Sequence, residues 1–233
     1  MMKIFTSGAF VNFILVIAGG LVGMLLKKGI PEKIRQTLMN AMALCVLFIG
    51  VTGLFEENIN TLIIIISAAV GAVLGQALDL DALVNRLALK IEGKFKKADD
   101  KNSRIAEGFA TATLLFCVGA MTVVGSIDSG ISGDNTTLYS KSVIDCISAA
   151  VFASAMGLGV VLSSVAVLVI EGGLTLLATV VQPVLTANVV AHMSVIGSLL
   201  IVAISLNMMG VTKIKVMNII PAIFLPILLC LFM

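Results

Sequence analysis

The sequence predicts an all-α, polytopic integral membrane protein, a helical bundle with seven or eight transmembrane helices. Of its 233 residues, 59% are hydrophobic and 12% are charged, and the mean hydropathy is +1.15. These values lie far outside those of soluble domains. Apolar runs of about 20 residues recur, the length that a helix needs to cross a bilayer. Segments such as 62–74 are apolar on all sides, which disfavours a membrane β-barrel.

The basic residues predict how the chain is oriented. Eleven of the fifteen Lys and Arg residues fall in two groups, although the net charge is only +2. The groups consist of Lys27, Lys28, Lys33 and Arg35, and of Arg86, Lys90, Lys94, Lys96, Lys97, Lys101 and Arg104. Because Lys and Arg near the ends of spans favour the cytoplasmic side, we expect loops 27–35 and 79–104 to be cytoplasmic. Acidic residues interrupt the second group, so we expect no nucleic-acid partner.

The N-terminal half of the single domain 1–233 reads as two similar units. Unit 1–58 contains a span, a surface helix that begins near Pro31, and a second span. Unit 59–125 contains a span, a charged amphipathic helix at 79–101, and another span. The first span of each unit carries a GxxxG pair suited to close helix packing, formed by Gly19 and Gly23 and by Gly71 and Gly75. This pattern predicts an internal duplication, with chance agreement between Gly-rich spans as the alternative.

The C-terminal half begins with a polar stretch rich in Gly, Ser and Asp. We expect residues 126–141 to form an extracytoplasmic loop and residues 142–233 to form the remaining helices. The first of these should cover about 143–163. The next apolar run, 164–185, contains Glu171 beside two glycines. It either crosses the bilayer or forms a broken or re-entrant helix.

Two further spans close the chain, at about 190–206 and 216–233, and two prolines should kink the last one. Lys213 and Lys215 lie between them. These lysines fall on the cytoplasmic side only if 164–185 crosses the bilayer. The preference of basic residues for that side therefore favours eight spans over seven.

Ionisable groups inside a bilayer are costly unless they pair or face a cavity, so each one is a candidate functional position. Lys141 and Asp145 are four residues apart on one helix face and could pair. Candidates for a substrate or ion pathway are Asp145, Lys141, Ser142, Asp128, Asp134, Glu171, Asn12 and Asn207. The competing interpretations are a surface loop with a charge that complements a helix dipole, an interfacial glutamate, and asparagines that only join helices.

The cysteine and histidine pattern indicates no metal or redox centre. The four cysteines lie in or beside apolar runs without CxxC or Cys/His spacing. The single histidine, His192, either carries protons or joins two helices by hydrogen bonds. Motifs for ATP, dinucleotide, metalloprotease and hydrolase chemistry are missing from the sequence. We therefore expect no enzyme activity, no cofactor and no metal.

Several motifs resemble those of a known family. They are FCVGAM at 116–121, GSIDSGISGD at 125–134, KS followed by Asp145, and Asn218 with Pro221. Together they resemble the YdfK/YqgA-like family of bacterial inner-membrane proteins, a domain-of-unknown-function family, over essentially the whole chain. The resemblance implies a multi-pass protein of the bacterial plasma (inner) membrane and implies no reaction.

The leading interpretation is a small secondary transporter or channel-like carrier of a polar solute or ion. Asp145 would contact the solute or ion, and Lys141 would be its partner. The GxxxG faces favour a homo-oligomer in the lipid bilayer. The alternative is a membrane structural or regulatory subunit that binds a partner through the basic helix at Leu80–Lys97. An intramembrane hydrolase is a weaker third interpretation, because no nucleophile and base form an evident pair.

Overall fold

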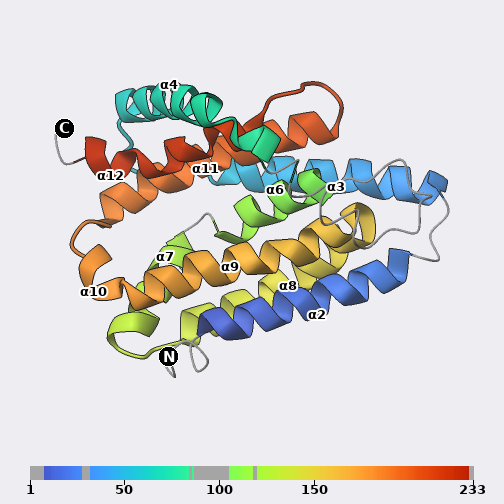
Figure 1. Ribbon diagram of the computed structural model, residues 1–233, viewed down its shortest axis with the longest axis horizontal. Coiled ribbons are helices and arrows are strands. Elements are labelled where there is room, and N and C mark those ends of the chain that lie inside the picture. The colour runs from blue at the N-terminus through green and yellow to red at the C-terminus, as the bar shows by residue number, and fades with distance from the viewer. Residues whose placement is uncertain (1–7, 28–31, 84–85, 87–104, 118–119, 231–233) are drawn as a thin grey trace.

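A computed structural model describes residues 8–27, 32–83, 86, 105–117 and 120–230, and all regular elements in these ranges are helices (Figure 1). The predicted all-α fold class is confirmed. The elements are α2 (Gly8–Lys27), α3 (Glu32–Thr52), α4 (Thr61–Leu78), α6 (Ile105–Cys117), α7 (Ala120–Ile131), α8 (Thr136–Met156), α9 (Leu158–Leu176), α10 (Ala178–Val181), α11 (Ala187–Met208), the 3-10 helix η1 (Val216–Phe224) and α12 (Pro226–Leu229).

Five of these helices, α2, α4, α8, α9 and α11, are long and apolar enough to cross a membrane. Helices α6 and α7 meet the same criteria together, but their axes are bent by 59°. Two shorter apolar helices, Met39–Thr52 and Val216–Leu229, account for the remaining apolar runs. Every apolar run of the sequence thus contains helix, and the count of seven or eight spans stays a prediction.

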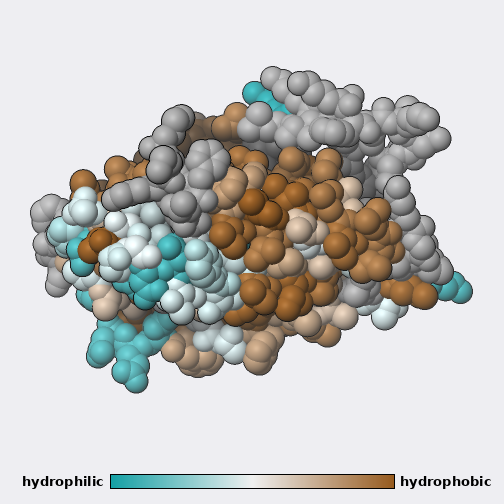
Figure 2. Space-filling model, turned by 90° about the horizontal axis from the view of Figure 1, so that it is seen from below, coloured by the Kyte–Doolittle hydropathy of each residue, from teal (hydrophilic) through white to brown (hydrophobic). Residues whose placement is uncertain are grey.

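The outside of the bundle is apolar, as a helix bundle in lipid requires. Large hydrophobic side chains such as Leu25 on α2, Val73 on α4 and Ile147 on α8 are more than half exposed. Figure 2 shows a broad hydrophobic face, with polar surface gathered at one end. So much exposed apolar surface would promote aggregation in water, whereas in a bilayer it contacts acyl chains.

Helices α2 and α8 lie side by side and run in the same direction. Gly8 at the start of α2 contacts Leu138 near the start of α8, and Gly23 near the end of α2 contacts Ala150. Helix α9 runs the opposite way. Helix α11 is antiparallel to α3 and is joined to it by the Ser205 hydroxyl, which donates to the Ala43 carbonyl over 2.7 Å.

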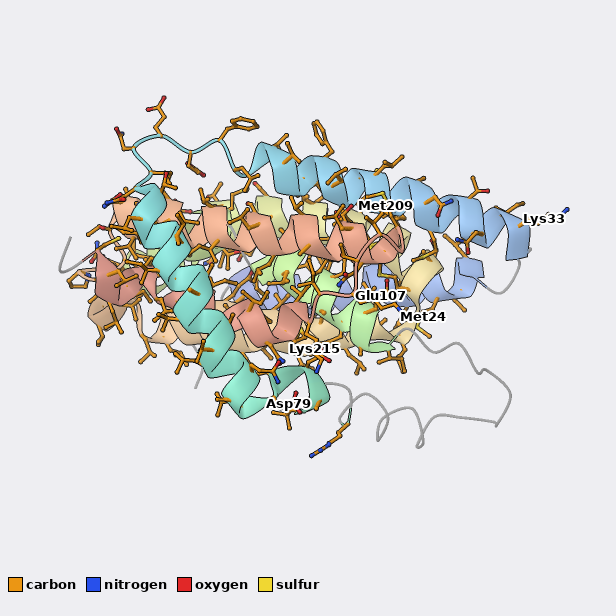
Figure 3. The ribbon with its side chains drawn as sticks, turned by 90° about the horizontal axis from the view of Figure 1, so that it is seen from above. Met24, Lys33, Asp79, Glu107, Met209 and Lys215 are labelled. Carbon is orange, nitrogen blue, oxygen red and sulfur yellow. The ribbon has the colours of Figure 1, made fainter. Side chains whose placement is uncertain are left out.

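The ends that carry the predicted cytoplasmic loops lie on the same side of the molecule. Figure 3 labels Met24, Lys33, Asp79, Glu107, Met209 and Lys215, which lie toward the right and lower part of the view. The connection between α3 and α4 lies at the upper left. The bundle therefore has two distinct ends.

Both GxxxG pairs lie where two helices touch backbone to backbone. A Cβ atom at Gly19 or Gly23 would overlap a carbonyl oxygen of α8, that of Cys146 or Ala150. The pair on α4, Gly71 and Gly75, packs in the same way on η1. The two pairs thus serve different partner helices, and the glycine that would complete the second unit of the expected duplication, at position 119, lies outside the described residues.

The turn between α8 and α9 corrects the expected boundary near residue 163. The chain turns at Gly157, whose φ of 76° lies in the left-handed region that glycine adopts readily. Ser163 lies inside α9, where its hydroxyl donates to the Val160 carbonyl of the same helix over 2.7 Å. Helices α8 and α9 therefore begin earlier in the sequence than their hydropathy suggested.

The stretch 126–141, expected as a loop, is mostly helical. Helix α7 continues to Ile131 and α8 begins at Thr136, so residues 132–135 make the connection. The hydroxyl of Ser132 donates to the Asp128 carbonyl over 2.7 Å, and Gly133 has a φ of 75°. Polar residues in the last turn of one helix and the first turn of the next produced the loop-like composition.

The helix break also lies elsewhere than expected. Helix α9 is continuous through Glu171 and its two glycines. The apolar run 164–185 is interrupted later, at Leu177, between α9 and α10. The bend occurs instead between α6 and α7, across residues 118–119, which lie outside the described part. Most of the amphipathic helix expected at 79–101, and of the partner surface at Leu80–Lys97, also lies outside it, although residues 80–83 are helical.

The packing predicts different effects for a Gly-to-Ala substitution in the contact between α2 and α8 and for one at an open position on α9. Gly19→Ala should destabilise the fold by about 1–3 kcal/mol, because the added methyl group overlaps backbone. Gly173→Ala on α9 has open space around its Cβ and should be neutral or stabilising by up to about 1 kcal/mol. Thermal unfolding in detergent, followed by circular dichroism, measures both. Equal midpoints for the two variants would contradict the close packing.

Candidate functional site

Four polar side chains from three apolar helices meet inside the bundle. They are Asn12 of α2, Lys141 and Asp145 of α8, and Glu171 of α9, and we call them the buried charge cluster. Their exposed fractions are 0%, 6%, 5% and 0%, respectively. Three of the four are ionisable, and such groups are rare inside membrane helices unless they pair or serve a function.

The cluster is held together by one ion-pair centre and one amide. The Lys141 ammonium bonds to Asp145 Oδ2 and lies 3.1 Å from Glu171 Oε1. Asn12 Nδ2 donates to Asp145 Oδ2 over 2.9 Å, and to Glu171 Oε1 and Oε2 over 2.9 and 3.1 Å. Both carboxylates therefore share the same ammonium and the same amide. The arrangement joins α2, α8 and α9 through polar side chains alone.

Helix periodicity explains why these side chains meet. Lys141 and Asp145 are four residues apart, which puts them on one face of α8. Asn12, Gly19 and Gly23 also share one face of α2, because they are separated by seven and four residues. The two glycines let the backbones of α2 and α8 approach closely. The short Asn12 side chain can then reach the carboxylates.

The cluster lies nearer the end of the bundle that contains the α7–α8 connection. Asn12 is four residues into α2, which places it about 6 Å along the helix axis from Gly8. Glu171 is five residues before the end of α9, or about 8 Å from it. The cluster is thus inside the apolar part of the chain, but closer to one surface than to the other.

The charges of the cluster do not balance. Two carboxylates and one ammonium carry a net charge of −1 when all three groups are ionised. In addition, the carbonyl oxygen of Asn12 is buried and has no hydrogen-bond donor within the described part of the chain. Both features leave negative potential in a region where uncompensated charge costs several kcal/mol.

Three other candidates lie beside the cluster or at the α7–α8 connection. The Ser142 hydroxyl is buried and donates to the Leu138 carbonyl of its own helix over 2.6 Å. Asp128 lies in the last turns of α7. Asp134 is exposed and accepts from the Thr136 N–H over 2.9 Å. Hydrogen bonds from Thr136 lower the pKa of Asp134, which is consistent with a carboxylate that starts α8.

Asn207 and His192 have structural roles away from the cluster. Asn207 ties the turn after α11, where its amide donates to the Ile214 carbonyl over 2.7 Å and its oxygen accepts from the Ile214 N–H over 2.9 Å. His192 joins α11 to the start of α4. Its Nε2 accepts from the Asn60 N–H over 2.9 Å, which leaves Nδ1 to donate to the Asn188 carbonyl over 2.8 Å.

An apolar cavity of about 380 Å³ lies beside the bent pair α6 and α7. Its few polar lining residues include Thr113 and Cys117 of α6. Ile170, which precedes Glu171 in α9, also lines this cavity. The sequence placed Cys117 in or beside an apolar run, and nothing in its spacing marked it as different from the other three cysteines.

Buried hydroxyl groups on four helices add further unsatisfied polar atoms. The hydroxyls without a hydrogen-bond partner among the described residues are those of Ser67 on α4, Thr111 and Thr113 on α6, Ser126 on α7 and Thr175 on α9. The Thr122 hydroxyl, in contrast, donates to the Phe116 carbonyl over 3.1 Å, across the bend between α6 and α7. It thus satisfies a backbone acceptor at the bend.

The comparisons with known proteins define the family. The family described as "Protein of unknown function (DUF554)" matches residues 7–231. The chain belongs to the DUF554 family. It is 29% identical over 222 residues to "Uncharacterized membrane protein YdfK" of Bacillus subtilis (strain 168), which covers 94% of this chain and 93% of that protein. It is also 29% identical over 220 residues to "Uncharacterized protein YqgA" of Escherichia coli (strain K12), with the same coverage.

These matches confirm the predicted family and the membrane class. No solved structure matches the chain. All four residues of the buried charge cluster lie inside the range matched by DUF554. The family description assigns no activity, so the function of this DUF554 protein has to be argued from its site.

The charge count predicts an asymmetry among variants of the cluster. Lys141→Met leaves two buried carboxylates without their ammonium and should lower the stability of this DUF554 protein by about 3–5 kcal/mol. Asp145→Asn or Glu171→Gln leaves one carboxylate opposite one ammonium, a balanced pair, and should have a much smaller effect. Unfolding midpoints measured in one detergent test this order. Equal losses in all three variants would show that the charges are not electrostatically coupled.

Proposed function

We propose that the chain is a small secondary transporter or channel-like carrier of a polar solute or ion, in the bacterial inner membrane. The observation that carries this proposal is the buried charge cluster on α2, α8 and α9. Replacing a buried ion pair by well-packed apolar residues is often neutral or stabilising. Helix packing alone is therefore a poor explanation for three ionisable groups inside the bundle.

The distribution of exposed charges supports an orientation for this carrier. Lys33 and Lys215 lie toward the same end of the bundle as Asp79 and Glu107. We propose that this end, with loops 27–35 and 79–104, is cytoplasmic. The connection between α3 and α4 at the other end carries Glu56 and Glu57. In this orientation, the cluster lies nearer the non-cytoplasmic surface.

The surroundings of the cluster support a polar route to it. The bent pair α6 and α7 places a helix interruption beside the apolar cavity, and irregular backbone at membrane depth is tolerated where protein or a water-lined cavity surrounds it. The Thr113 hydroxyl on the cavity wall is buried and has no hydrogen-bond partner within the described residues, so it is available to water or solute.

The proposal extends to assembly and chemistry. We propose a homo-oligomer, because a bundle of this size encloses little volume. The GxxxG pairs do not supply its interface, since they pack on α8 and η1 of the same chain. The partners would be the lipid bilayer and a small polar solute or ion, with no nucleic acid. A carrier of this kind needs no cofactor and catalyses no reaction.

Reconstituted flux tests the proposed function directly. Purified protein in proteoliposomes should take up at least one member of a fixed panel, comprising protons, alkali cations, amino acids, sugars and small carboxylates, faster than empty liposomes do. Asp145→Asn and Glu171→Gln should slow that uptake by about tenfold or more, which corresponds to ~1.4 kcal/mol on the barrier. The reason is that each removes one charge from the proposed pathway.

Glu57→Gln is the matched control, because it neutralises an exposed acidic residue outside the cluster and should transport normally. Gel filtration and circular dichroism should show that all variants remain folded. Uptake no faster than in empty liposomes for every panel member would overturn the proposal. Unchanged flux in Asp145→Asn would remove Asp145 from the pathway.

A further inference from the structure

We infer that the buried charge cluster binds one monovalent cation, a proton or an alkali-metal ion, between its two carboxylates and the Asn12 carbonyl oxygen. As an identification of the coupling ion, the inference rests on the proposed function. As a statement about binding, it can be tested without any flux. Three features point to this occupant: the net charge of the cluster, the unused carbonyl oxygen of Asn12, and the hard character of the carboxylate and amide oxygens.

The net charge of the cluster calls for one more positive charge. Asp145 and Glu171 share the single ammonium of Lys141, so one negative charge is left over when all three groups are ionised. The cluster is almost fully enclosed, and an uncompensated charge in such a place is strongly unfavourable. A monovalent cation restores neutrality, whereas a divalent cation would leave an excess positive charge.

The Asn12 side chain supplies an unused ligand atom at the same place. Its amide nitrogen donates to both carboxylates, which fixes the orientation of the amide. The carbonyl oxygen is then an acceptor that is fully buried and meets no donor among the residues described. An acceptor in that state is satisfied by a cation, a protonated group or a water molecule, and of these only the first two also supply the missing positive charge.

The ligand chemistry limits the occupant to two kinds. Carboxylate and amide oxygens are hard ligands, which suit alkali-metal ions rather than soft transition metals. A proton on either carboxylate supplies the same single positive charge and turns that carboxyl into a hydrogen-bond donor. Because either occupant alone neutralises the cluster, protons and alkali-metal ions should compete for it.

Few other charged or titratable groups surround the cluster. Of the helices packed against α8, α9 contributes Glu171, α6 contains the Cys117 thiol and carries Glu107 in its first turn, and α7 carries Asp128 near the connection to α8. Residues 8–26 of α2 contain no ionisable side chain, and the charged residues of α3, at positions 32, 33 and 35, lie in its first turn. A pH-dependent loss of cation binding is therefore assigned to the carboxylates of the cluster.

Thermal unfolding of the purified protein in detergent tests the inference. Midpoints are compared in NaCl, LiCl, KCl and choline chloride at constant ionic strength. Alkali-ion binding should raise the midpoint saturably, on the order of 5 °C when the ion is ~100-fold above its Kd, and should release protons into a weakly buffered sample. Lowering the pH should reduce the effect, because protons compete for the same oxygens.

A bound proton gives a different result. The alkali ions would then have no effect, and infrared difference spectra in choline chloride at neutral pH should show a protonated carboxyl group. In either case the signal should be lost in Asp145→Asn and in Glu171→Gln, because Lys141 then balances the remaining carboxylate. It should persist in Glu57→Gln. A wild-type protein with neither cation-dependent stabilisation nor a protonated carboxyl would overturn the inference.

The flux experiment tests the proposed function and the binding experiment tests the inference, so a negative result in one can be told from a negative result in the other. If uptake depends on Asp145 but no cation or proton is bound, the inference is wrong and the proposed function stands. If a cation binds and is lost in both amide variants, but no panel member is transported, the site is established and the proposed function is wrong. Asn12→Ala gives a further check, since it should weaken cation binding at least severalfold by removing one ligand oxygen.

Discussion

Two carboxylates share one ammonium and one amide, and the association of α2, α8 and α9 depends on this interaction. Lys141 and Asn12 each contact Asp145 and Glu171, so a change of charge on any of the three ionisable members affects the rest of the cluster. In water, such contacts would contribute little, because solvent would screen them. Inside an apolar bundle they are strong, and each unsatisfied group is correspondingly costly.

The glycine contacts between α2 and α8 are the packing condition for this interaction. Gly19 and Gly23 allow backbone-to-backbone contact along the same face of α2 that presents Asn12. Asparagine is a short side chain, so it can reach carboxylates on two neighbouring helices only if those helices lie close together. Small residues that allow close approach and a polar residue that uses it are a common combination in membrane bundles.

The site combines features that a purely structural bundle would not need. The cluster on α2, α8 and α9 has an unbalanced charge, and the bent pair α6 and α7 lies next to a largely apolar cavity that α9, α11 and η1 also line. Elsewhere in the bundle, the Ser205 hydroxyl joins α11 to α3, and Asn218 and two glycines join η1 to α4. Membership of DUF554 establishes the kind of protein, and the cluster indicates where in it to look for function.

The sequence by itself determined the membrane class, the helical content and the pairing of Lys141 with Asp145, because hydropathy and the i, i+4 relation depend only on local chain geometry. It also marked Asn12 and Glu171 as polar residues in apolar runs. It did not predict that they meet, nor that the chain turns at Gly157 and bends after Cys117 while α9 continues through Glu171. Those features depend on which helices are neighbours, and only the tertiary structure decides that, since residues more than a hundred positions apart satisfy one another's charges and hydrogen bonds.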